Sequence, residues 1–133
     1  MALEPVPSLA PRVADVCREV VTALPDEIAP DVDRRVTSPP SVSTAAWGDP
    51  AVTFRCGTAR GSVRDDLYEL DGVLWAMHDS GASRTWTTVE ARVPVQVVVP
   101  DAYSDQAEML GSLAAALAPT EPKAVRTAGP ARP

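Results

Sequence analysis

Histidine, aspartate and serine stand side by side at residues 78–80, and these are the residue types of a hydrolytic triad. A working triad is assembled by the fold beside an oxyanion hole, whereas adjacent residues of a strand point to opposite faces. The sequence also lacks the Gly-x-Ser-x-Gly nucleophile elbow. We therefore predict that His78, Asp79 and Ser80 form a strand end and a turn, and we predict no catalytic residue.

Metal and cofactor chemistry has few candidate ligands in this sequence. The chain has one histidine and two widely separated cysteines, too few for a zinc site. The acidic segment 26–33 has neither the spacing nor the glycine of a calcium loop, so a solvated acidic loop is favoured. We expect no metal site and no cofactor.

Two groups of residues could instead form a ligand or partner surface. The first is a set of carboxylates, Asp65, Asp66 and Glu69, which glycosidase-like acid/base chemistry would need at a fixed separation in a cleft. The second is a set of tryptophans, Trp47, Trp75 and Trp86, which could line a sugar or peptide groove. The alternatives are a charged hairpin face for the carboxylates and core packing for the tryptophans.

Most of these candidate residues lie in or next to segments that are predicted to be strands. Period-two alternation, β-branched residues and turn signals predict strands at residues 51–56, 67–70, 73–78, 84–90 and 95–99. Asp71-Gly72 is a strong hairpin signal between two of them. Residues 34–37 form a further candidate, a short edge strand, and residues 95–99 are apolar enough for a central strand or one covered by a partner.

Two amphipathic helices flank the strands. Apolar residues recur with a helical period over residues 11–24 and again over residues 104–117. Pro11 suits the first helical position and Ser104 suits an N-cap. We predict an α+β fold, an antiparallel meander of four to five strands with both helices on one face.

The composition indicates one acidic globular domain. The chain has 133 residues, a net charge of −6 and a hydrophobic content of 45%. We predict a flexible segment at residues 1–10, one domain at residues 11–119 and a proline-rich disordered tail at residues 120–133. No Lys/Arg cluster is present, which excludes the usual nucleic-acid and anionic-membrane binders.

Cys17 and Cys56 lie on the predicted apolar faces of the first helix and of the strand 51–56. In a reducing cytosol they would be buried thiols, and in an oxidising compartment they could pair. The first residues, MALEPVPSLAP, lack the basic start and apolar run of a signal peptide, and no stretch approaches a membrane span.

Several segments together resemble the actinobacterial family known as domain of unknown function 3515. They are the run C-x-x-V-x-x-A-L-P-D at residues 17–26, R-x-V-T at 34–37, A-A-W-G-D-P-A-V-x-x-R-C-G at 45–57, E-L-D-G-V-x-W at 69–75, W-T-T-V at 86–89 and V-V-V-P-D-A-Y at 97–103. The resemblance covers roughly residues 11–119.

The resemblance implies an extracytoplasmic cell-envelope or secreted protein, and it implies a disulfide between Cys17 and Cys56. Family members usually carry an N-terminal membrane segment or secretion signal, so we expect membrane contact only through a segment absent from this chain. No activity is implied. We expect a non-catalytic module that binds or scaffolds an envelope protein or cell-wall component. The alternative is a domain that binds or hydrolyses cell-wall glycan or peptide.

Overall fold

The computed structural model describes residues 10–35 and 43–120. The helices and strands follow one another in this order: α1 (Pro11–Ala23), β1 (Glu27–Ala29), β2 (Val32–Arg35), β3 (Thr44–Trp47), β4 (Val52–Cys56), β5 (Asp66–Leu70), β6 (Val73–Asp79), β7 (Ser83–Thr88), β8 (Val95–Pro100), α2 (Gln106–Gly111) and the 3₁₀ helix η1 (Ala114–Thr120). The predicted flexible segment before Ala10, the tail after Thr120, and Val36 and Thr37 of the predicted edge strand lie outside the described residues.

Within the described residues, the strands form one antiparallel sheet of eight, in the order β1-β2-β3-β4-β8-β7-β6-β5. The predicted α+β class and antiparallel pairing are confirmed, but four to five strands was too low a number. β2 was predicted as an edge strand and is not one, because β1 pairs with its outer side.

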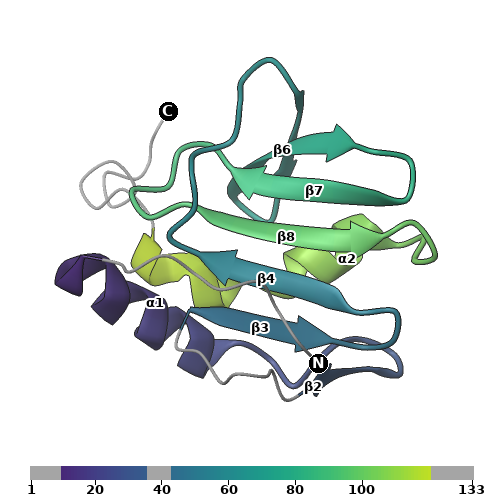
Figure 1. The fold of residues 1–133 in the computed structure, drawn as a ribbon, viewed down its shortest axis with the longest axis horizontal. Coiled ribbons are helices and arrows are strands. Elements are labelled where there is room, and N and C mark those ends of the chain that lie inside the picture. The colour runs from purple at the N-terminus through teal and green to yellow at the C-terminus, as the bar shows by residue number, and fades with distance from the viewer. Residues whose placement is uncertain (1–9, 36–42, 121–133) are drawn as a thin grey trace.

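The topology joins two four-strand meanders. β1 to β4 are sequential neighbours, as are β5 to β8, and the long connection after β4 takes the chain to the far edge of the sheet (Figure 1). The second meander then returns, so that β8 pairs with both β4 and β7. The prediction that residues 95–99 form a central strand is confirmed.

Helix α1 closely follows its prediction. Pro11 occupies the first helical position, and Cys17, Val20 and Val21 are buried. The helix ends at Ala23, and its C-cap, Leu24, has the extended backbone that the following Pro25 favours.

The predicted helix over residues 104–117 is two elements instead of one. The N-cap of α2 is Asp105 and not Ser104, and α2 ends at Gly111. Beyond it, the Leu113 N–H donates to the Leu110 carbonyl at 3.1 Å, a bond that spans three residues. Such bonds are typical of 3₁₀ structure, and η1 continues it to Thr120.

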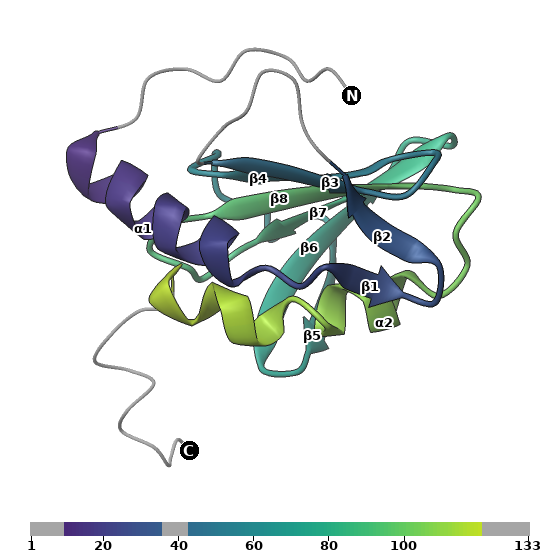
Figure 2. The same cartoon turned by 90° about the horizontal axis from the view of Figure 1, so that it is seen from below.

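All three helical elements lie on the same side of the sheet, as Figure 2 shows. This confirms the prediction that the helices cover one face. The sheet curls around them, because α2 contacts both edge strands, β1 and β5. Strand burial alternates accordingly: Val52, Phe54 and Cys56 of β4 are buried, whereas Thr53 and Arg55 are partly exposed.

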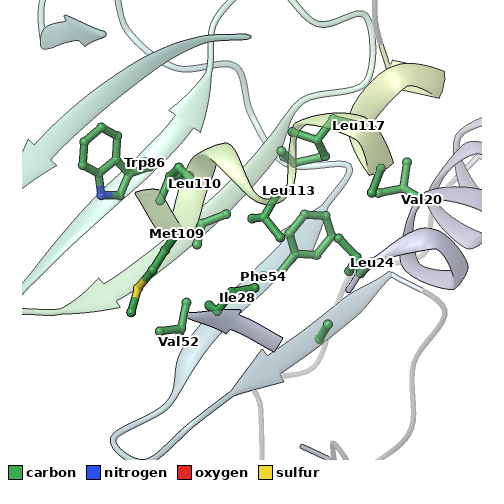
Figure 3. Packing of buried hydrophobic residues seen from close by; sticks show 14 of the residues in the cluster. Val20, Leu24, Ile28, Val52, Phe54, Trp86, Met109, Leu110, Leu113 and Leu117 are labelled. Carbon is green, nitrogen blue, oxygen red and sulfur yellow. The ribbon is translucent and has the colours of Figure 1, made fainter. Parts of the chain in front are cut away.

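The hydrophobic core fills the space between the sheet and the helices. Figure 3 shows Val52 and Phe54 of β4 in this core together with Leu110 and Leu113 of the C-terminal helical segment, with Phe54 next to Leu113. These side chains are almost fully buried. Burial of this apolar area is the main favourable contribution to folding, and it fixes which face of each strand is internal.

Candidate functional site

The three tryptophans belong to the core. Trp47 and Trp75 are 0% exposed and Trp86 is 4% exposed. The Trp47 indole N–H donates to the Pro25 carbonyl at 2.9 Å, and that of Trp86 donates to the Gln106 side-chain oxygen at 3.0 Å. The hypothesis of a tryptophan-lined groove is therefore wrong, because these side chains have no surface to offer a ligand.

His78, Asp79 and Ser80 make separate contacts. The His78 Nδ1 lies 3.8 Å from an Asp65 oxygen, and the Asp79 carboxylate lies 3.6 Å from Arg84 on β7. The Ser80 hydroxyl donates to the Ser83 carbonyl at 3.0 Å. The three adjacent side chains do not form a hydrogen-bonded triad.

The three predicted carboxylates lie on or beside β5, but they do not converge. Asp66 is opposite Met77 and Glu69 is opposite Leu74. Cross-strand partners share a face and side chains alternate, so Asp66 lies on the core side and Glu69 on the other side of the sheet. Asp65 precedes the strand and faces His78. A glycosidase needs two carboxyls directed at one bond, and Asp66 and Glu69 do not provide that.

The same strand exposes apolar side chains that the sequence analysis did not single out. Leu67 and Tyr68 are 43% and 41% exposed, and Val63, just before the strand, is 69% exposed. The Tyr68 ring rests on Trp86 with the ring centroids 5.4 Å apart. We call residues 63–70 the β5 edge. The sequence does contain a signal for this exposure. Leu67 and Tyr68 are adjacent on one strand and must point to opposite faces of the sheet, so at least one of them faces away from the core.

Backbone groups of the β5 edge also point outward. Among the strands that the structure describes, β5 is the last one on this side of the sheet. The Val89 N–H donates to the Leu74 carbonyl, so Leu74 directs that carbonyl toward β7 and not toward its β5 partner, Glu69. Pairing types alternate along an antiparallel ladder, which leaves the N–H and carbonyl of Glu69 and of Leu67 directed away from β6.

Neither a cluster of metal ligands nor a membrane-spanning helix is present in the part of the chain that the structure describes. Across residues 10–35 and 43–120, no three His, Cys, Asp or Glu side chains gather closely enough to hold a metal ion. None of the described helices is long and apolar enough to cross a membrane.

Comparison with known proteins identifies the family. Residues 1–125 match the family described as Protein of unknown function (DUF3515). The chain belongs to the DUF3515 family. No curated protein and no solved structure matches it.

The segments that carry the DUF3515 resemblance meet in space. Arg34 donates from its two terminal nitrogens to the carbonyls of Leu24 and Val21, both at 3.4 Å. Its guanidinium carbon lies 5.9 Å from the centroid of the Trp47 ring. Carbonyls at a helix C-terminus lack partners within the helix and favour a nearby cation. In this DUF3515 protein, Arg34 therefore joins the end of α1 to Trp47.

The W-G-D-P turn is held by the D-A-Y segment. Gly48 has φ +72°, and the Tyr103 hydroxyl donates to the Pro50 carbonyl at 2.6 Å. A Cβ at Gly48 would lie 2.6 Å from that hydroxyl and 3.0 Å from a methyl group of Val32. These DUF3515 residues are explained by packing of the fold.

The disulfide links the first helix to the sheet. Cys17 of α1 and Cys56 of β4 are bonded, with their Cα atoms 5.7 Å apart. Both residues are buried, at 0% and 1% exposure. The pairing that the family resemblance implied is present, inside the layer between helix and sheet.

Proposed function

We propose that this DUF3515 protein is a non-catalytic module that binds a partner polypeptide at the β5 edge. The observation that carries the proposal is the exposure of Val63, Leu67 and Tyr68 on and beside β5, whose side away from β6 pairs with no other described strand. Edge strands are sites where other chains add by pairing, and apolar residues gathered at an edge are typical of interaction surfaces.

We further propose that the protein acts on the extracytoplasmic side of an actinobacterial cell envelope. The disulfide between Cys17 and Cys56 supports this location, because disulfides persist in oxidising compartments and are rare in a reducing cytosol. The envelope proteins that the chain resembles support the same location.

The hydrolytic or glycan-binding alternative has less support. It relied on exposed tryptophans and on carboxylates that act together, and the tryptophans are buried. Asp66 and Glu69 lie on opposite faces of the sheet. A binding role for the carboxylates remains, because both flank the exposed apolar pair Leu67 and Tyr68 on β5.

In-cell photocrosslinking tests the proposed surface. A photoreactive amino acid replaces Leu67 in one variant, and replaces Thr22, an exposed residue of α1, in a matched control. After irradiation of living cells, we expect a discrete protein adduct from position 67 and none from position 22. Adducts from position 22 alone, or equal adducts from both positions, would contradict a partner at the β5 edge.

A further inference from the structure

The β5 edge presents a fixed sequence of side chains to an incoming strand. Along Asp66, Leu67, Tyr68 and Glu69 the order is acidic, apolar, apolar, acidic, and all four residues are exposed. Side chains directly opposite each other across a strand pair interact most strongly. A complementary strand therefore carries basic residues opposite Asp66 and Glu69 and apolar residues opposite Leu67 and Tyr68.

Building on the proposed binding role, we propose that the partner contributes an extended segment that pairs with β5 as an added strand and carries the pattern basic–apolar–apolar–basic. The outward N–H and carbonyl groups of Leu67 and Glu69 supply the main-chain hydrogen bonds. The pattern reads the same in both directions, so it does not depend on the direction of the added strand. Addition of an extended peptide to a sheet edge is an established mode of recognition.

A second copy of this chain fits the β5 edge poorly. Two copies related by a two-fold axis would pair their β5 strands in antiparallel fashion, and only residues with outward N–H and carbonyl groups could form the hydrogen-bonded pairs. Three registers satisfy this condition: Leu67 opposite Leu67, Glu69 opposite Glu69, or Leu67 opposite Glu69 of the other copy. Pairing Leu67 with itself sets Asp65 against Glu69, and pairing Glu69 with itself sets two carboxylates directly opposite. The remaining register sets each Leu67 against a carboxylate. Residues 64–71 contain four carboxylates and one arginine, so two copies would also repel each other.

The opposite edge of the sheet offers less to a partner. β1 has three residues, and its one large apolar side chain, Ile28, is buried in the core. The β5 edge is longer and exposes apolar side chains on both faces. The proposal is therefore confined to β5.

Peptide titration of the full chain tests the side-chain pattern. The probe is a blocked peptide, Ser-Lys-Val-Val-Lys-Ser, and the control has the same composition in the order Ser-Val-Lys-Lys-Val-Ser. Binding is followed by NMR chemical shifts up to millimolar peptide. We expect the probe to bind at least about tenfold more tightly, as the sum of four favourable cross-strand pairs. Equal affinity for the two peptides would overturn the pattern.

A proline variant tests the added strand. Because the Leu67 N–H points away from β6, Leu67→Pro removes an outward donor while sparing the β5–β6 ladder, and edge strands tolerate such a proline. The matched control, Leu67→Ala, removes the side chain and keeps the N–H. We expect the proline variant to bind the probe at least about tenfold more weakly than the alanine variant. Equal binding by the two variants would overturn strand addition.

N-methylation of the peptide tests strand addition on the unchanged protein, so the result does not depend on whether the proline variant folds. An added strand directs alternate N–H groups toward β5, so methylation of one valine nitrogen should abolish binding and methylation of the other should not. Equal effects at both positions would overturn the proposal. If crosslinks form at position 67 in cells while neither peptide binds, the pattern fails and the proposed binding role stands.

Discussion

Trp47 shows how a residue can resemble a ligand-binding group in sequence and serve the fold in structure. Its ring is buried, its N–H is hydrogen-bonded to the Pro25 carbonyl, and Arg34 lies over it. Sequence alone leaves such a tryptophan undecided, because burial is set by neighbours that arrive from distant parts of the chain. The large apolar side chains that are exposed in the described residues are instead Val63, Leu67 and Tyr68, beside exposed carboxylates.

The contact between Gly48 and Tyr103 makes a prediction at the residue scale. Gly48→Ala should lower the free energy of unfolding by about 1–3 kcal/mol, because φ is +72° and the new Cβ would meet the Tyr103 hydroxyl. Tyr103→Phe should cost about 1 kcal/mol through loss of the bond to Pro50. Denaturant unfolding of both single variants and the double variant measures the coupling.

In the Tyr103→Phe background, Gly48→Ala should cost less than in the native protein, because the oxygen that the Cβ meets is gone. The part of the Gly48→Ala cost that comes from the positive φ at this position should remain. Strictly additive effects would show that the contact is not responsible.

At the scale of elements, the predicted helices and strands that formed are those with a clear local signal. Helix α1 and strand β4 have a regular apolar period, β5 and β6 flank the Asp71-Gly72 turn, and β8 is a nearly continuous apolar run; each appears within a residue or so of its predicted bounds. The two-residue hairpin turn is explained by Asp71 and Gly72, both of which have positive φ.

The strands that were missed, β1 and β3, lack a clear local signal. β1 has three residues, between Pro25 and Pro30, and the start of the mostly charged strand β2 was also missed, because only residues 34 and 35 of it were predicted. β3 reads Thr-Ala-Ala-Trp and is buried on both faces, so it shows no alternation, and alanine has low strand propensity. The division of the last helix into α2 and η1 also depends on packing, because residues 104–117 read as one helical stripe.

The disulfide makes a prediction at the element scale. Replacing both Cys17 and Cys56 by alanine should lower the free energy of unfolding by about 3–4 kcal/mol, because the bridge closes a loop of 39 residues between α1 and β4. Denaturant unfolding measures this, with the reduced native protein as the control, which should match the double variant. A loss below about 1 kcal/mol, or free thiols in protein purified from an oxidising compartment, would contradict this role.

At the scale of the whole molecule, the helices and the core cover one face of the described sheet, and of its two edge strands β5 is the longer and the more exposed. The placement of β8 beside β4 pairs residues about 40 apart in sequence, such as Phe54 and Val97. No local pattern reports such a pairing, so the order of strands was not predictable. The same strand order makes β5 an edge strand, and it is this order that places the carboxylates predicted from sequence at the proposed binding surface.

Amide hydrogen exchange on the full chain tests strand addition at the β5 edge most directly. NMR measures the exchange rate of each backbone N–H, with and without the Ser-Lys-Val-Val-Lys-Ser peptide. We predict that the Leu67 and Glu69 amides, which face away from β6, exchange quickly in the free protein and become protected when the peptide binds. The Tyr68 amide, which faces β6, should change little. Peptide binding with no new protection at Leu67 and Glu69 would contradict the added strand.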